Sequence, residues 1–195
     1  MYNFDQVYHE MERHGMKLPQ SKIKVKIKNA QQVLESALIY FLKREDKDMI
    51  WLPEYDEVVD WLSDNQGRGL FLYGQCGRGK SLLGRMVLPA ILLKFSQKVV
   101  SVFDMQDMNR DVDYALSKHL ISLDDVGTEE QSVKYGQRRW AFDEIVDAAE
   151  KYNKLILISS NQSVDNLRER YGDRTLDRIK STTKRIMFRG ESLRS

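Results

Sequence analysis

The chain has 195 residues, of which 42% are hydrophobic and 31% are charged, and its formal net charge is +2. This length fits one domain with a short extension, and because no long apolar stretch or signal-peptide pattern is present we expect neither a membrane-spanning nor an exported protein. The single cysteine excludes an intrachain disulfide, so we expect a globular protein of a reducing compartment, the cytoplasm.

Residues 1–50 read as an extension that precedes a main domain of residues 51–195. Within it, residues 22–28 alternate lysine with apolar residues, which predicts a strand with one apolar and one lysine face. The lysine face either contacts single-stranded DNA or guards the strand edge against aggregation. Residues 30–43 follow with the apolar stripe of an amphipathic helix, and the charged residues 44–48 form the expected junction.

From residue 69 onward, short apolar runs alternate with long helical patterns, notably at residues 80–95 and 138–151. This alternation predicts an α/β fold with a parallel sheet covered by helices on both faces. In such sheets the ligand lies beyond the carboxyl ends of the strands. The expected strands are Gly69–Tyr73, Val99–Phe103, His119–Asp124, Leu155–Ser159 and Lys184–Phe188.

The turn after the first of these strands fits the phosphate-binding pattern G-x-x-x-x-G-K-[ST]. A strand that enters a glycine-rich turn and then a helix directs several backbone N–H groups at one point. Lys80 is expected to reach the outer phosphates of a nucleotide, and the Ser81 hydroxyl is expected to hold Mg²⁺. The expected binding residues are Gly74, Gln75, Cys76, Gly77, Arg78, Gly79, Lys80, Ser81 and Leu82.

Two adjacent acids close the apolar run that begins at His119. Asp124 is expected to orient Mg²⁺ through its waters, and Asp125 to polarise the water that attacks the nucleotide. Should Asp125 not serve, Glu129 and Glu130 are next in line.

A polar tip also follows the apolar run of residues 155–158, and it ends at Asn161. If this strand lies beside the first, the Asn161 amide is placed to position the same water. The alternative is an ordinary turn, or a cap of the helix expected at residues 164–170.

The segment from Asn161 onward holds nine basic residues against five acidic ones. Such a segment either contacts phosphates, on nucleic acid or on the nucleotide of a neighbouring subunit, or forms a solvated basic surface.

Over residues 68–195 the chain resembles the DnaC-type AAA+ ATPases, the bacterial helicase loaders, whose relatives include transposition-helper ATPases. The resemblance rests on the phosphate loop and on Leu123-Asp-Asp-Val-Gly127, Ile158-Ser-Ser-Asn161, Tyr171-Gly-Asp-Arg-Thr-Leu-Asp-Arg-Ile179 and Arg189-Gly-Glu-Ser-Leu-Arg194. It implies an AAA+ P-loop fold, a three-layer sandwich with a five-stranded parallel sheet. No helical lid is expected after Phe188, as in the minimal members.

The resemblance also implies roles for single residues. Asp124 and Asp125 become the Walker B pair, Asn161 the first sensor, and Lys80 and Ser81 the ligands of phosphate and Mg²⁺. Arg174 becomes the arginine finger that reaches a neighbour's nucleotide, with Arg178 as second choice. Otherwise Arg174 pairs with Asp173 or Asp177.

The implied function is an ATP- and Mg²⁺-dependent ATPase that self-associates on ATP and loads or remodels a replicative helicase, with single-stranded DNA as a further partner. Residues 104–118 are short for a loader, whose DNA-contacting helices lie there. Three alternatives stay open: a transposition or phage-replication helper, a small-molecule phosphotransferase, and a nucleotide-gated interaction module that scarcely hydrolyses, since aspartate at position 125 reaches less far than glutamate.

Overall fold

The computed structural model describes residues 3–16, 18–130, 132–134 and 137–193. In chain order its elements are α1 (Phe4–Arg13), α2 (Ala30–Lys43), α3 (Pro53–Ser63), β1 (Gly69–Gly74), α4 (Lys80–Leu82), the π-helical turn η1 (Leu83–Val87), α5 (Leu88–Ser96), β2 (Ser101–Asp104), the 3₁₀ turn η2 (Met105–Asp107), α6 (Met108–Ser117), β3 (Leu120–Asp124), β4 (Ser132–Lys134), β5 (Gln137–Arg139), α7 (Ala141–Tyr152), β6 (Leu155–Ser160), α8 (Val164–Thr182) and β7 (Thr183–Phe188).

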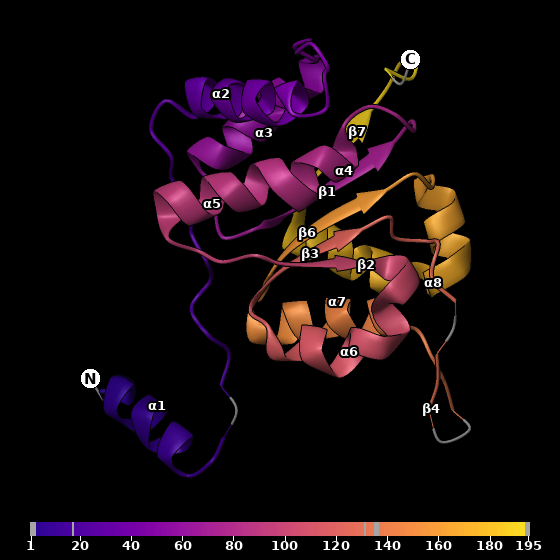
Figure 1. Ribbon diagram of the computed structural model, residues 1–195. Helices are drawn as coiled ribbons and strands as arrows, with labels where there is room; N and C mark the ends of the chain where they lie inside the picture. Colours follow the sequence, from indigo (N-terminus) through magenta and orange to yellow (C-terminus); the bar gives the residue numbers. More distant parts are fainter. Residues whose placement is uncertain (1–2, 17, 131, 135–136, 194–195) are drawn as a thin grey trace.

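The centre of the molecule is a parallel sheet of five strands in the order β2-β3-β6-β1-β7 (Figure 1). All five strands expected from the sequence are present, which confirms the predicted fold class. β3 and β6 are buried along their whole length, because helices cover both faces of the sheet and leave no polar side. The carboxyl ends of β1, β6 and β3 therefore meet at one edge.

Helices cover the sheet on both faces, and each face carries its own hydrophobic core (Figure 1). Along β1 the side chains alternate: Leu70 and Leu72 pack with α2, α3 and α5, whereas Phe71 packs with α6, α7 and α8. Each fully buried side chain of this size contributes about 1.5–3 kcal/mol of transfer free energy. Two cores on one sheet make the expected three-layer sandwich.

Residues 22–28 do not form the strand that the alternation predicted. The alternation of burial is present, since Val25 and Ile27 are buried. Their backbone groups, however, bond to the end of α3 and its following turn: Ile27 N–H donates to Leu62 O at 3.0 Å and Val25 N–H to Asn65 Oδ1 at 2.8 Å. An alternating pattern fixes which side chains are buried, but a strand also requires a neighbouring strand, and a helix end takes its place here.

The core continues across the boundary that the sequence suggested at residue 50. Leu34 and Leu38 of α2 are fully buried against the same cluster as Val58 and Leu62 of α3. The exposed residues 44–48 thus connect two helices that share one core. Only α1 among the described helices of this region has no buried residue.

Two helical boundaries also differ from expectation. The pattern at residues 80–95 is one helical run that passes through η1, and the pattern that began at residue 138 gives a helix only from Ala141. Beyond β7 the described residues Arg189–Leu193 form no helix. No helix of the described part is long and apolar enough to cross a membrane.

Candidate functional site

The phosphate loop requires glycine at its two ends. Gly74 has φ 116°, and a Cβ there would lie 2.3 Å from the Phe188 carbonyl oxygen of β7. Gly79 has φ 83°, and its Cβ would lie 3.1 Å from the Tyr55 hydroxyl. Other residues rarely adopt these angles, so the sequence pattern follows from the backbone path. The Gln75 N–H donates to Phe188 O at 3.0 Å, which fixes the loop against β7.

The Lys80 side chain lies inside this loop. Its residue is 4% exposed, and Nζ donates to the carbonyls of Gly74 at 3.1 Å and Gln75 at 2.6 Å. A cleft of about 570 Å³ opens beside it, lined by the loop, the start of the following helix, Tyr55, Asn161 and the connection after α2. This volume falls in the range of small-molecule sites. Burial raises the pKa of Tyr55 to about 12, so its phenol faces the cleft uncharged.

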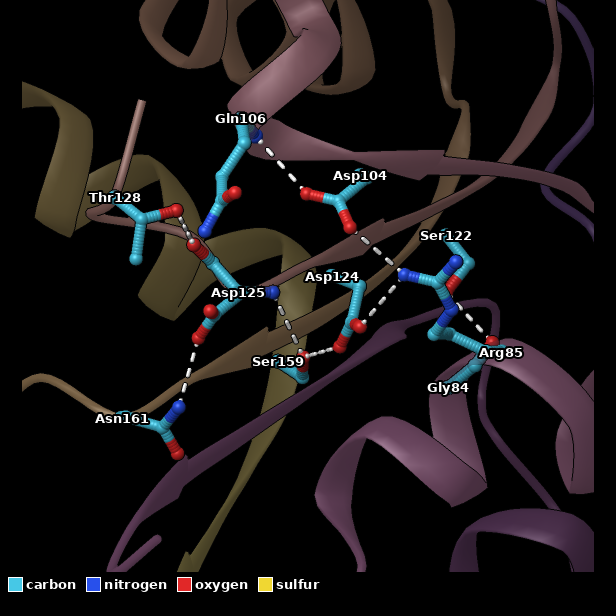
Figure 2. Close-up of polar contacts among 10 residues, drawn as sticks. All are labelled: Gly84, Arg85, Asp104, Gln106, Ser122, Asp124, Asp125, Thr128, Ser159 and Asn161. Carbon is cyan, nitrogen blue, oxygen red and sulfur yellow. Dashed lines mark hydrogen bonds and ion pairs between the residues drawn. The ribbon is translucent and has the colours of Figure 1, made fainter. Parts of the chain in front are cut away.

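At the end of β3 the Asp124 carboxylate is buried and held by two donors, as Figure 2 shows. The Ser159 hydroxyl on β6 donates to Oδ1, and Arg85 Nη1 donates to Oδ2 at 3.2 Å. The same Arg85 nitrogen lies 2.9 Å from Asp104 Oδ2 at the end of β2. Arg85, Asp104 and Ser159 were not predicted from the sequence. The spacing of Ser81 and Arg85, four residues apart on one helical run, was the available signal.

Asp125 and Asn161 are brought together at the same edge (Figure 2). Asn161 Nδ2 donates to Asp125 Oδ1 at 2.7 Å, and the Asp125 N–H donates to Ser159 Oγ at 3.1 Å. Asp125 has φ 61°, which turns the chain sharply out of β3. Asn161 does not cap α8, because the Ser163 hydroxyl does so by accepting from the Asn166 N–H at 3.1 Å.

The residues expected to hold Mg²⁺ suit that ion in type. Ser81 and Arg85 line the cleft, and the Asp124 carboxylate lies behind them, 3.2 Å from Arg85 Nη1. Within the described residues no group of three or more His, Cys, Asp and Glu side chains forms a metal cluster. A magnesium ion at this place would thus rely on phosphate oxygens and water for its other ligands, as Mg²⁺ commonly does.

Glu129, the reserve candidate for water activation, is engaged elsewhere. Glu129 is buried. Its carboxylate accepts hydrogen bonds from the Tyr171 hydroxyl and, at 3.0 Å, from the Gly127 N–H. Burial, followed by the Glu129 charge, raises the pKa of Tyr171. These bonds tie the loop after β3 to α8, so Glu129 has a structural role.

The two arginines proposed as fingers differ in their surroundings. Arg178 is 17% exposed at its side chain and pairs with Asp147 at 2.5 Å and Glu150 at 3.0 Å on α7. Arg174 is exposed and makes no ion pair with another described residue; Asp173 instead pairs with Arg168 at 3.1 Å. Of the two, Arg174 is thus the exposed arginine without an ion pair among the described residues.

Residues 189–193 close on the phosphate loop, a contact that the sequence did not reveal. Leu193 N–H donates to Gly77 O at 3.0 Å, and Arg78 Nη1 to Glu191 O at 3.4 Å. Arg78 Nη2 also lies 3.5 Å from Glu54 Oε2 on α3. The Arg78 side chain therefore links the loop to α3 and to residues 189–193. Only the backbone of Arg78 belongs to the expected phosphate site.

Cys76 gives a direct test of the loop, because it is exposed and the sequence contains no other thiol. We expect a bulky maleimide on Cys76 to block ATP binding, and bound ATP to slow the labelling. Labelling is followed by intact mass with and without nucleotide, with Cys76→Ser as the unlabelled control. Equal labelling rates in both conditions would contradict a nucleotide at this loop.

No protein-family model matches the chain, and no curated protein matches it. Several solved structures, however, are similar to the chain in fold. The DnaC helicase loader aligns over 84% of this chain and 93% of its own, with a TM-score of 0.54 and 17% identity. DnaI aligns over 65% of this chain and 73% of its own, with a TM-score of 0.52 and 21% identity.

AMPPCP-bound DnaA from Aquifex aeolicus gives a TM-score of 0.53 at 17% identity, over 73% of this chain and about half, 49%, of DnaA. The likeness to these three proteins concerns the arrangement of the sheet and its helices. The chain therefore shares with them the fold that its sequence predicted, a parallel five-stranded sheet between two layers of helices.

Proposed function

We propose that the protein binds and hydrolyses ATP in the cleft beside Lys80 and uses this cycle to load or remodel a replicative helicase during DNA replication. One observation carries the proposal: Lys80, the Asp124 carboxylate and the Asp125–Asn161 pair stand at the carboxyl ends of three adjacent strands, β1, β3 and β6. Of the proteins with a similar fold, DnaC is a helicase loader and DnaA binds the ATP analogue AMPPCP, which supports both halves of the proposal.

The residues of the site divide the chemistry between them. Lys80 exchanges its bonds to the Gly74 and Gln75 carbonyls for the outer phosphates, and the loop N–H groups bind the remaining oxygens. Ser81 and Asp124 would hold Mg²⁺, which would supply positive charge to offset that of the phosphates. The Asp125 carboxylate and the Asn161 amide, already in contact, orient the attacking water, and Asp125 accepts its proton.

Arg174 completes the site of a neighbouring subunit in this proposal. Its exposed guanidinium stabilises the charge of the transition state only when two copies associate. ATP binding thus favours self-association, and hydrolysis releases the neighbour. The helicase, single-stranded DNA and a cytoplasmic location belong to the same proposal.

The proposal is tested by phosphate release from ATP, measured alone, with single-stranded DNA and with the replicative helicase of the same organism. We expect turnover to rise in the presence of DNA, helicase or both. Transfer of phosphate to a metabolite acceptor, with no response to DNA or helicase, would instead indicate a phosphotransferase.

Asp125→Asn should retain ATP affinity and lose turnover by roughly 10²–10⁴-fold, because only the group that accepts the proton of water is removed. Equilibrium titration and phosphate release on the same preparation separate the two effects. Asp177→Asn, which changes an exposed carboxylate on α8, is the matched control. Turnover at the unchanged rate in Asp125→Asn would show that another group activates the water.

A further inference from the structure

Arg85 owes its position to an unusual stretch of helix. The helical run after the phosphate loop widens into the π-helical turn η1, where Leu88 N–H donates to Leu83 O five residues back. Pro89 follows and has no N–H of its own, which suits a break in the α-helical bonding. The Ser122 hydroxyl on β3 donates to Gly84 O at 2.8 Å and fixes the turn against the sheet. The turn thus holds Arg85 beside the ends of β2 and β3.

One nitrogen of Arg85 donates hydrogen bonds to two carboxylates (Figure 2). Nη1 lies 2.9 Å from Asp104 Oδ2 and 3.2 Å from Asp124 Oδ2. Asp104 is itself fixed, because its other oxygen accepts from the Gln106 N–H at 3.0 Å. A single positive charge is therefore shared between an exposed partner and a buried one: the side chains of Asp104 and Asp124 are 36% and 6% exposed.

Asp124 has no oxygen left without a donor. Oδ1 accepts from the Ser159 hydroxyl and Oδ2 from Arg85. A cation at Asp124 would meet the positive charge of Arg85 at the same carboxylate, and like charges this close repel strongly in a partly buried place. The shorter contact of Arg85 with Asp104 offers an alternative that keeps the guanidinium paired.

We propose that Arg85 is a positioning residue that sets the Mg²⁺ affinity of the nucleotide site. Without metal it neutralises Asp124, and when the metal binds it moves wholly onto Asp104. Asp104 thereby favours metal binding at a site that it does not itself contact. This inference rests on the proposed nucleotide function, since it needs a metal–nucleotide complex at Asp124.

The test is the affinity for Mn²⁺, measured by electron paramagnetic resonance on the full chain with a slowly hydrolysed ATP analogue bound. Arg85→Gln is expected to tighten Mn²⁺ binding by about tenfold, because the competing charge is gone. Asp104→Asn is expected to weaken it by a similar factor, because Arg85 then remains on Asp124. The double variant should match Arg85→Gln, since Asp104 acts only through Arg85.

Controls separate this effect from general charge and from folding. Lys94→Gln removes an exposed positive charge from α5 of the same helical run and should leave Mn²⁺ affinity unchanged. Affinity for the analogue in EDTA should be the same in all variants, and circular dichroism monitors the fold. If Arg85→Gln does not fold, Asp104→Asn still decides, because a purely structural ion pair predicts no change in metal affinity.

The outcomes are distinct. Unchanged or weaker Mn²⁺ binding in Arg85→Gln, or unchanged binding in Asp104→Asn, overturns the role of Arg85 while the unchanged chain still binds nucleotide. A chain that binds no nucleotide, with or without Mn²⁺, overturns the proposed function and this inference together. Opposite shifts in the two variants support the inference.

Discussion

Arg174→Ala is expected to bind ATP as the unchanged chain does and to hydrolyse it roughly 10³–10⁵ times more slowly, under conditions where the protein self-associates. The side chain is exposed and unpaired among the described residues, so it contributes little to folding: even a surface ion pair is worth only about 0–1 kcal/mol. It stands just after Gly172, where φ 82° and ψ 166° interrupt α8. A large loss of rate without a loss of stability would show that Arg174 acts in the chemistry and not in the fold.

Mixing experiments decide whether Arg174 acts on a neighbour. Arg174→Ala mixed with Lys80→Ala should recover part of the activity, because the first supplies an intact nucleotide site and the second an intact arginine. Arg178→Ala is the comparison: its ion pairs with Asp147 and Glu150 join α8 to α7, so its loss should lower the unfolding temperature rather than respond to mixing. An inactive mixture at concentrations that support self-association would refute action between subunits.

Lys80→Ala is expected to weaken ATP binding by roughly 10²-fold or more, because hydrogen bonds from a charged donor contribute about 1.5–3 kcal/mol each. In this structure the ammonium group is bonded to the Gly74 and Gln75 carbonyls, which border the cleft and can turn to water instead. The fold should therefore survive. Fluorescent-nucleotide titration measures the affinity, and circular dichroism measures the fold.

Lys94→Ala, which shortens an exposed lysine on α5, is the control for this prediction and should bind ATP normally. Tight ATP binding by Lys80→Ala, at the affinity of the unchanged chain, would overturn the assignment of the cleft as a nucleotide site.

The five strands and the phosphate loop were predictable because their signals are local. A continuous apolar run marks a strand buried on both faces, and Gly74 and Gly79 mark backbone angles that other residues rarely adopt. The prediction of a strand at residues 22–28 was wrong because its signal concerns only side chains. The alternation correctly indicates which side chains are buried, but it cannot tell whether the backbone bonds to a strand or to the end of a helix.

The sequence places Arg85 four residues after Ser81 on one helical run, but its role could not be predicted because that role depends on tertiary structure. Its two partners come from β2 and β3, and Arg85 itself lies within the π-helical turn η1. Glu129 shows the same limit, since its position near Asp125 in the chain suggested chemistry, whereas the fold turns it toward Tyr171. Spacing identifies candidates, and side-chain contacts decide among them.

The contact between the phosphate loop and residues 188–193 also constrains the order of events on the ribosome. Arg78 and its partner Glu191 are separated by 113 positions, and β7, the strand that holds Gln75, is made late as well. At synthesis rates of about 5–20 residues per second, the loop waits roughly 6–23 seconds for these partners. A nascent chain therefore exposes its phosphate loop long before that loop acquires the supports that give it the shape described here.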